Sequence, residues 1–567
     1  MVNEEVSSDK AHANPKNLGA YYTDSQVADF LVSWAVRGNT DTILDPSFGG
    51  GVFLRSSCKR LRDLKGDTNS QVFGVEFDEP VHRRISEKLH EEFGVAPANL
   101  IESDFFALDP GQLKPVDVIV GNPPFIRYQR FAGALRERAL TRAAEQGLRL
   151  SQLSSSWLPF LIHSVRFLRM GGRLAMVIPF EIAHAAYASP VLKHLALKFE
   201  SVTFLTFRKK LFPDLSEDAL LLLAEGRHER VFKARFFLRD LQHAGCLSSV
   251  QDPNHGSITG VRNLNTERIV TGEERLIEYV LSRKARDLYR ELRSHESIVR
   301  LGQLADVGIG YVTGANDFFH LAPEIAEQWK IPKRFLRPCV RRGRALSGLR
   351  LTHKDWCELL GTGEASYLLE LPGEGDLPDT VERYLADGRR RGVNKTFKCR
   401  SRSPWYRVPH VYLPDGFLTY MSGDVPRLVA NDARVVAPNT LHILRLHAET
   451  QIHCDGIAAL WRTSLARMSA EVEGHALGGG MLKVEPGEAE RVMLPFVAKN
   501  GSLEALAVEL DQIARSRGDE ACNRCADQQL LRRGIGLSAS DVHLLRASAD
   551  VLRERRTSRS VSDDRHR

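Results

Sequence analysis

Residues 116–125 read V-D-V-I-V-G-N-P-P-F, an apolar run that ends in a rigid tetrapeptide. The β-branched side chains predict a buried strand. The two consecutive prolines supply no backbone N–H and stiffen the chain, so nearby carbonyl groups lack partners from a strand. Average residue usage makes Asn-Pro-Pro-Phe a chance event on the order of a few in a thousand for a chain of this length. The stretch therefore predicts a rigid loop with free carbonyl oxygens at the end of a strand.

Strands and helices alternate on both sides of this stretch. Short β-branched runs predict further strands at residues 42–44, 72–75, 99–102, 173–178, 202–207 and 219–223. Amphipathic segments predict helices at residues 81–93 and 157–170. This alternation predicts an α/β fold with a parallel, doubly wound sheet that carries helices on both faces. Such sheets bind ligands in the crevice at the carboxyl ends of their strands.

Three other loops at that edge carry groups suited to a ligand with ribose and adenine parts. Residues 45–51 read D-P-S-F-G-G-G and let the backbone approach a ligand, but no Gly-Lys-Ser/Thr follows, which excludes a phosphate loop. Glu76 ends a predicted strand where it can accept hydrogen bonds from ribose hydroxyls, and Asp104 ends the next, where it can accept one from an adenine amino group. Each feature alone also fits a tight turn or a solvated loop. Their order along the chain favours a cofactor site.

The residue types at 122–125 suit chemistry on an exocyclic amino nitrogen. On adenine this nitrogen is conjugated with the ring and is a poor nucleophile. If the Asn122 side-chain oxygen and the Pro123 carbonyl accept its hydrogens, its lone pair becomes available, and no dedicated base is needed. Phe125 offers a flat face to an extruded base, and such stacking contributes about 1–3 kcal/mol per base. The alternative is a proline turn that only fills space.

The order of these motifs resembles the gamma-class DNA adenine-N6 methyltransferases, and the resemblance covers nearly the whole chain. L-G-A-Y-Y-T at residues 18–23, followed by a predicted helix at 26–34, looks like the family's N-terminal cofactor motif. Residues 171–179 resemble its fifth strand, and L-F-P at 211–213 looks like a later motif whose aromatic side chain packs on the flipped adenine. The resemblance implies a Rossmann-like methyltransferase sheet, S-adenosylmethionine as methyl donor and double-stranded DNA as substrate, in a restriction-modification or related system.

The resemblance also implies functional residues at matching positions. The implied catalytic residues are Asn122, Pro123, Pro124 and Phe125. The implied cofactor-binding residues are Tyr21, Tyr22, Thr23, Asp45, Pro46, Gly49, Gly51, Glu76, Asp104 and Asn122. Phe125 and Phe212 are expected to stack on the target base. Two positions depart from the family pattern, because Phe125 stands where many relatives have Tyr and Phe48 stands where a small residue is frequent.

The alternation is lost after residue 235, which predicts a change of domain. We expect a flexible N-terminus at 1–16, an S-adenosylmethionine-binding domain at 17–235 and a connector at 236–300 with a basic helix at 282–293. Residues 306–319, 403–409 and 477–483 look like recurring turns of the family's target-recognition domain. We therefore expect a mixed α+β target-recognition domain at 301–500, then a helical C-terminal appendage at 501–567 with a disordered tail.

Two basic clusters, at residues 333–344 and 389–407, lie in the expected target-recognition domain. Cations neutralise phosphates, and arginines and aromatic side chains reach base edges. The residues expected to contact DNA are Arg337, Arg341, Arg342, Arg400, Arg402 and Trp405. The net charge of +7 permits a polyanionic partner, and a solvated charged surface is the alternative for either cluster.

Cysteine spacing and hydropathy bear on metal binding and on cellular location. The eight cysteines lack the spacing of a disulfide framework, and the single C-x-x-C at Cys522 and Cys525 has no second ligand pair, so we expect no metal site. The N-terminus is polar, and no apolar run approaches the roughly 20 residues that span a bilayer. These features predict a cytoplasmic protein.

Three other interpretations of the Asn-Pro-Pro motif are open. A protein-glutamine methyltransferase would not need so large and basic a second domain. A non-catalytic DNA-binding subunit would not need intact motifs. Only a comparison of substrates distinguishes an RNA base methyltransferase from a DNA methyltransferase. A separate cognate restriction endonuclease and the recognition sequence lie beyond this chain.

Overall fold

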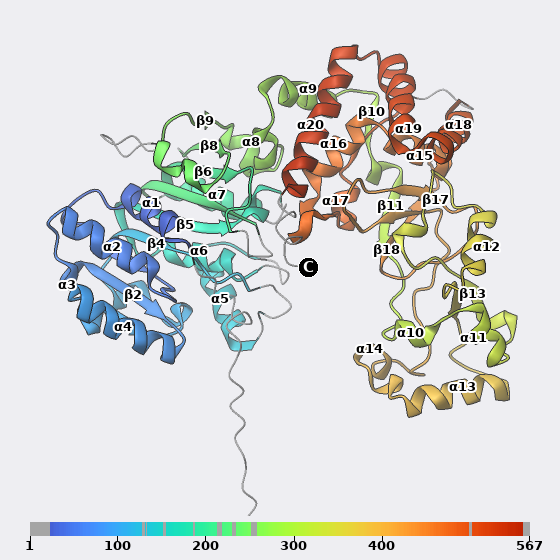
Figure 1. Ribbon diagram of the computed structural model, residues 1–567, viewed down its shortest axis with the longest axis horizontal. Helices are drawn as coiled ribbons and strands as arrows, with labels where there is room; N and C mark the ends of the chain where they lie inside the picture. The colour runs from blue at the N-terminus through green and yellow to red at the C-terminus, as the bar shows by residue number, and fades with distance from the viewer. Residues whose placement is uncertain are drawn as a thin grey trace, which may run out of the picture. The chain divides into compact units, whose positions relative to one another are not determined.

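The computed structural model describes residues 23–126, 131, 133–150, 155–184, 188–212, 218–229, 234–250, 258–497 and 502–558 (Figure 1). Contacts within the chain divide it into two compact units. The first unit is Met1–Val280 with Leu477–Gly479 and Ser558–Arg567, and the second is Leu281–Ala476 with Gly480–Thr557. Each unit is described by itself. Among the described residues, no helix is both long enough and apolar enough to cross a membrane.

The first unit is built on a nine-stranded sheet with the order β3-β2-β1-β4-β5-β7-β6-β8-β9. The strands are β1 (Ile43–Asp45), β2 (Val72–Glu76), β3 (Leu100–Glu102), β4 (Val116–Gly121), β5 (Leu168–Pro179), β6 (Phe199–Phe207), β7 (Ala219–Arg227), β8 (Arg235–Leu241) and β9 (Arg262–Asn263). β1 pairs in parallel with both β2 and β4, so the order of strands reverses at β1. That reversal creates the crevice where sheets of this kind bind ligands.

The helices of the first unit pack in two groups. They are α1 (Ser25–Ala35), α2 (Val52–Asp63), α3 (Thr68–Gln71), α4 (Glu79–Phe93), α5 (Gly133–Glu145), α6 (Trp157–Val165), α7 (Ser189–Lys198) and α8 (Thr266–Thr271). α1, α2 and α4 pack on strands β1 to β5, whereas α6 and α7 pack on β5 and β6 and on each other. Local signals fix several ends: Asp24 caps α1, and α4 starts at the Asp78 cap and ends at Gly94 in the left-handed conformation. The α/β fold with helices in two layers is confirmed.

All seven predicted strands are present, with ends that differ by a few residues. The predicted helix at 157–170 stops at Val165, because β5 starts at Leu168, which pairs with Val116. The prediction of a parallel sheet is wrong for β7, which is antiparallel to both β5 and β6. Apolar runs indicate a buried strand, but they carry no information about its direction.

The expected connector at 236–300 is wrong in its first part. β8 pairs in parallel with β6 from Ser201↔Arg235 to Phe207↔Leu241, and β9 pairs with β8. Phe236 and Leu238 are buried, so these residues extend the sheet instead of leaving it. The contact boundary falls at Val280, and the predicted basic helix follows it as α9 (Arg283–Arg293), capped by Ser282.

The second unit joins small antiparallel sheets to many helices. Its strands are β10 (Ile298–Arg300), β11 (Ala305–Ile309), β12 (His320–Leu321), β13 (Leu336–Pro338), β14 (Tyr367–Leu369), β15 (Gly416–Thr419), β16 (Met421–Ser422), β17 (Leu428–Ala430), β18 (Leu441–Leu446), β19 (His475–Ala476), β20 (Leu482–Lys483) and β21 (Met493–Pro495). Its helices after α9 are α10 (Asn316–Phe319), α11 (Pro323–Gln328), α12 (His353–Gly361), α13 (Asp379–Arg390), α14 (Phe397–Arg400), α15 (Cys454–Trp461), α16 (Ser464–Glu473), α17 (Pro486–Ala489), α18 (Ser502–Arg517), α19 (Asp519–Ala526) and α20 (Ala539–Thr557). The main sheet has the order β11-β18-β15-β17. This is the expected mixed α+β architecture.

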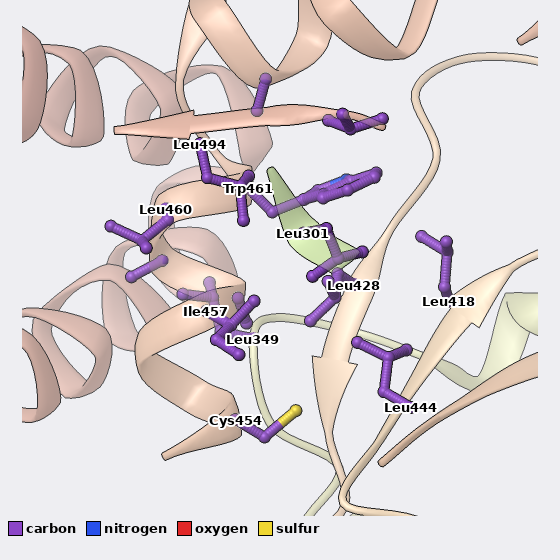
Figure 2. Close-up of a cluster of buried hydrophobic side chains, with 14 of the residues drawn as sticks. Leu301, Leu349, Leu418, Leu428, Leu444, Cys454, Ile457, Leu460, Trp461 and Leu494 are labelled. Atoms are coloured by element: carbon purple, nitrogen blue, oxygen red, sulfur yellow. The ribbon is translucent and has the colours of Figure 1, made fainter. Parts of the chain in front are cut away.

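The core of the second unit lies between α15 and this sheet. Ile457 and Leu460 of α15 pack in one buried cluster with Leu428 and Leu444 of the strands (Figure 2). Leu503, Ala507 and Leu510 of α18 belong to the same cluster. The expectation of a separate appendage at 501–567 is therefore wrong for its helices, which complete this core. The end of the expected tail, residues 559–567, lies outside the described residues.

A buried ion pair holds the last helix. The Arg556 guanidinium donates from Nε and Nη2 to the Glu471 carboxylate at 3.0 and 2.9 Å, and from Nη1 to the carbonyls of Gly423 and Gly480 at 2.9 and 2.5 Å. Burial raises the pKa of Glu471, while its hydrogen bonds with Arg556 lower it. A buried charge that loses its partner is costly, so this pair joins α16, α20 and two loops.

Replacing Glu471 by Gln leaves the buried Arg556 without a counter-charge. We expect Glu471→Gln to lower the free energy of unfolding of the second unit by about 3 kcal/mol. Calorimetric melting measures the effect. The control is Glu520→Gln, which removes a solvent-exposed pair with Arg524 on α19 and should leave the melting temperature unchanged. Equal melting of Glu471→Gln and the wild type would contradict this role.

Candidate active site

The candidate site lies at the carboxyl ends of the neighbouring strands β1 and β4. Asp45 is the last residue of β1 and Gly121 is the last of β4. The two approach so closely that a Cβ atom on Gly121 would lie 3.0 Å from Asp45 Oδ1. Ser47 Oγ then donates to the Asn122 carbonyl at 3.4 Å. The glycine loop after β1 and the Asn-Pro-Pro loop after β4 are thus side by side.

The amide of Asn122 is held with its oxygen free. Asn122 Nδ2 donates to Thr23 Oγ1 at 3.1 Å, just before α1. Asn122 Oδ1 is buried and has no hydrogen-bond partner among the described residues. A buried acceptor of this kind costs free energy unless a donor arrives. Thr23, expected to bind cofactor, therefore also orients the candidate catalytic amide.

The proline loop is fixed by a residue that the sequence analysis missed. Ser156 Oγ donates to the Pro124 carbonyl and accepts from the Ile126 N–H at 2.9 Å. The Pro123 carbonyl accepts no hydrogen bond from any residue that the structure describes. Two acceptors, Asn122 Oδ1 and the Pro123 oxygen, thus remain available on neighbouring residues. No motif marks Ser156, because its contact depends on the tertiary fold.

Glu76 organises the glycine loop. Its Oε2 accepts from the Gly49 N–H at 2.8 Å, and its Oε1 accepts from the N–H groups of Phe77 and Asp78, both at 2.9 Å. Gly51 has a φ of +74°, and a Cβ there would lie 2.6 Å from Ile85 Cγ2. The loop thus needs this glycine for its conformation and for the approach of α4.

Phe48 packs away from solvent on β2. Its backbone N–H donates to the Val75 carbonyl at 3.1 Å, and its ring centroid lies 5.8 Å from that of His82. A Cβ on Gly74 would lie 2.7 Å from the Phe48 ring. The large residue at this position is therefore accommodated by a glycine in the neighbouring strand.

Asp45 is a buried carboxyl with one free oxygen. Its Oδ1 accepts from the Ser47 N–H at 3.1 Å, whereas Oδ2 has no partner among the described residues. Burial raises the pKa of Asp45 to about 8, the Ser47 hydrogen bond lowers it, and the negative charge of Glu76 raises it. A cationic group placed at Oδ2 would favour the ionised form.

Asp104 is already paired in this structure. Its Oδ1 accepts from the Phe106 N–H at 3.0 Å, and its Oδ2 accepts from Arg138 of α5 through Nη2 at 2.8 Å and Nε at 2.9 Å. Arg138 was not predicted, because nothing in the sequence places α5 beside this loop. Any amino group that binds Asp104 shares its carboxylate with this guanidinium.

Three aromatic side chains that are candidates for stacking differ in exposure. Phe77 follows Glu76 directly and is 64% exposed, and the sequence analysis missed it although an apolar residue between two acids was a visible signal. Phe125 and Phe212 are both buried. Among the described residues, no hydrogen bond or ring contact joins Phe212 to the Asn122 loop. The expected cofactor residues Tyr21 and Tyr22 lie outside the described residues.

The predicted DNA-contacting residues fall into two classes. Arg337, Arg342 and Arg400 are exposed and Arg341 is partly buried. Arg402 instead donates to the carbonyls of Val312 and Thr313 at 2.6 and 2.8 Å. Trp405 packs on Phe318 with 5.6 Å between ring centroids. Because Arg402 and Trp405 serve internal contacts, the prediction that they contact DNA is corrected.

Comparisons with known proteins agree with this geometry. Residues 2–235 match the model of the family N-6 DNA methylase, and residues 273–531 match that of the type II methyltransferase M.Eco57I, C-terminal domain. The type II methyltransferase M.AccI of Acinetobacter calcoaceticus is 22% identical over 92% of this chain and 96% of that protein. M.XamI of Xanthomonas campestris pv. amaranthicola is 23% identical over 85% of this chain and 86% of that protein.

A solved structure agrees at the level of fold. The type IIL restriction-modification enzyme MmeI in complex with DNA has a TM-score of 0.60 at 12% identity, over 94% of this chain and 75% of that chain. The match to the N-6 DNA methylase family and the similarity to type II methyltransferases identify an adenine-specific DNA methyltransferase. The N-terminal part of the chain, residues 2–235, belongs to the N-6 DNA methylases, and the two family matches together indicate a methyltransferase of restriction-modification type. The predicted family and activity are confirmed.

The buried carboxyl of Asp45 predicts a pH-dependent stability. Its pKa is about 8 in the fold, against the ordinary value of 3.8 for an aspartate, so between those pH values the folded chain keeps a proton that the unfolded chain releases. Stability from this group therefore falls as pH rises toward 8. We expect the difference in melting temperature between Asp45→Asn and the wild type to grow from pH 5 to 8 and level off above 8.

The control for this measurement is Asp67→Asn. Hydrogen bonds from Ser70 and the Asn69 N–H lower the pKa of Asp67, so that carboxylate is ionised in both states throughout the window. Its melting difference should not change between pH 5 and 8. A flat difference for Asp45→Asn as well would show that Asp45 is ionised in the fold.

Proposed function

We propose that this chain transfers a methyl group from S-adenosylmethionine to the N6 amino group of an adenine extruded from duplex DNA. Asn122 and Pro123 are proposed to be the residues that activate the nitrogen. The observation that carries this proposal is the buried Asn122 Oδ1, which lacks a partner among the described residues and lies beside the free Pro123 carbonyl. Two adjacent acceptors match the two hydrogens of an exocyclic amino group.

The residues around β1 and β2 fit S-adenosylmethionine. The free Oδ2 of Asp45 suits the cationic amino group of the methionine part, and Tyr21, Tyr22, Thr23 and Pro46 are further candidates. Gly49, Gly51 and Glu76 are proposed to hold the ribose side. Phe77 offers an exposed apolar face to the adenine, and Asp104 an acceptor for its amino group. When bound, S-adenosylmethionine supplies a sulfonium methyl group whose bonding pair stays on sulfur.

The chain's contribution to the reaction is orientation and polarisation. Thr23 holds Nδ2 of Asn122, so Oδ1 faces the incoming amino group. Hydrogen bonds to Oδ1 and to the Pro123 carbonyl draw the nitrogen toward tetrahedral geometry. Its lone pair then forms the new N–C bond, and the methylated nitrogen releases one proton. Ser156 keeps the loop in place through Pro124. Preorganised groups of this type contribute most when water is excluded.

Extrusion of the adenine needs compensation. Flipping a base out of a duplex costs a few kcal/mol, which stacking and two hydrogen bonds offset. Phe125 is the proposed stacking face because it directly follows the acceptor residues, and Phe212 is proposed as a second one. The phenyl ring of Phe125 preserves the stacking face that a tyrosine would provide.

The second unit is proposed to read the DNA. Arg337, Arg341, Arg342 and Arg400 are the proposed phosphate contacts, because their side chains reach solvent at least in part. The similarity to the type II methyltransferases M.AccI and M.XamI supports a role in DNA modification, and a separate cognate restriction endonuclease is proposed as its partner. Such a pair would act in the cytoplasm, where bacterial DNA lies.

Expression in a host without adenine methylation tests the mechanism. We expect single-molecule sequencing to find methylated adenines at one short motif. Asn122→Ala removes one of two acceptors and should reduce transfer at least about 10²–10³-fold, the range for losing one preorganised hydrogen-bonding group. Ser156→Ala leaves both acceptors and should reduce transfer less. Binding of duplex DNA should persist in both variants.

Two results would contradict the proposal. Unchanged transfer by Asn122→Ala would remove Asn122 from the mechanism. An unmodified genome, from folded wild-type protein that binds S-adenosylmethionine, would contradict adenine in DNA as its substrate.

A further inference from the structure

The short helix α14 presents a bare aromatic side chain. Phe397, its first residue, is 68% exposed, which makes it the most exposed large apolar side chain that the structure describes. Lys398 Nζ lies 5.7 Å and Arg400 Cζ 5.5 Å from the centre of its ring. Single exposed apolar residues are common, so exposure alone does not assign a function. The surroundings of Phe397 distinguish it.

The chain around Phe397 carries only positive charge. Between Asp387 and Asp415 no Asp or Glu occurs. The same segment contains Arg389, Arg390, Arg391, Lys395, Lys398, Arg400, Arg402 and Arg407. All of these except Arg402 are exposed. Arg389 pairs with Glu382, and Arg390 and Arg391 pair with Asp387. Lys395, Lys398, Arg400 and Arg407 form no ion pair with a described residue, so the surface around Phe397 complements a polyanion.

α14 packs against the loop before α10 and is hydrogen-bonded to it. The Arg402 guanidinium donates to the carbonyls of Val312 and Thr313, and the buried Cys399 thiol donates to the Thr313 carbonyl at 3.7 Å. A Cβ on Gly314 would lie 2.6 Å from the Lys398 Cβ, so this loop passes directly against α14. Figure 1 shows α10 and α14 as neighbours in the second unit. The ring of Phe397 is thus carried by a supported helix.

We propose that Phe397 is an apolar wedge that stacks against bases of duplex DNA while Lys398 and Arg400 contact the flanking phosphates. Apolar side chains inserted at base steps are a known way to bind and deform a duplex, and stacking on an aromatic ring tolerates every base. The proposal rests on the proposed function, because it requires that the second unit binds DNA. It replaces Trp405, which packs internally, as the aromatic contact of this cluster.

A protein partner fits this surface less well. Stable protein interfaces bury about 1,600 Å² around an apolar centre. Here one phenyl ring stands among cations, while the neighbouring Cys399 is buried and Trp405 is partly buried against the same core cluster. Charge and a single stacking ring match a nucleic acid.

The test uses the full-length protein with S-adenosylhomocysteine and a duplex that contains its mapped modification motif. 2-Aminopurine is placed in turn at each position of the motif and its flanks. We expect the wild type to change the fluorescence at a position other than the methylated adenine. Phe397→Ala should abolish that signal and weaken DNA binding about 10-fold, while Phe397→Trp preserves both. Lys398→Gln and Arg400→Gln should each lower the slope of log K against log salt by about 1.

The control Val508→Ala removes exposed apolar surface from α18 and should change neither signal nor affinity. Circular dichroism and S-adenosylmethionine binding verify that each variant is folded. Wild-type binding and methylation with unchanged behaviour of Phe397→Ala would overturn the wedge and leave the proposed function intact. A wild type that neither binds nor methylates the duplex would overturn both. Loss of affinity without any second fluorescent position would also overturn the wedge, because Phe397 would then contact something other than bases.

Discussion

The site depends on how closely the end of β4 passes the buried carboxyl of Asp45. The parallel strands β1 and β4 are neighbours in the sheet there, and Gly121 has no side chain to hold them apart. This contact brings the Asp45 carboxyl, at the end of β1, and the Asn122 amide, after β4, to the same side of the candidate site. Asn122 and Asp45 each keep one buried oxygen without a partner among the described residues. A buried acceptor without a donor costs free energy, and a ligand that supplies donors to these two oxygens would offset that cost.

The sequence predicts this part of the site well because its residues lie in short motifs at strand ends. Apolar runs locate the strands, and Asn-Pro-Pro-Phe marks the loop that carries the chemistry. The direction of β7 and the membership of β8 in the sheet were not predictable in the same way. Strand direction and pairing are set by tertiary contacts, such as those of the buried Phe236 and Leu238 in β8, and no local pattern encodes them.

The same limit applies to supporting residues. Ser156 fixes Pro124 and Arg138 binds Asp104 from segments distant in the sequence, so neither belongs to a motif. In the basic cluster, composition suggested Arg402 and Trp405, but composition cannot tell an internal contact from an exposed one. The guanidinium of Arg402 satisfies two backbone carbonyls, and the Trp405 ring fills space beside Phe318. Exposed charge and buried charge look alike in a sequence.

The buried pair of Arg556 and Glu471 has a consequence for synthesis on the ribosome. Glu471 emerges from the exit tunnel long before Arg556. The carbonyls of Gly423 and Gly480, which accept hydrogen bonds from the same guanidinium, are also synthesised before it. Until α20 is made, the Glu471 carboxylate lacks the guanidinium that forms hydrogen bonds with it in the folded unit. A nascent chain must therefore leave this region open or protonated while translation continues. Final closure of the second unit is thereby coupled to completion of its last helix, and a message broken near its 3′ end would produce a protein whose second unit does not close.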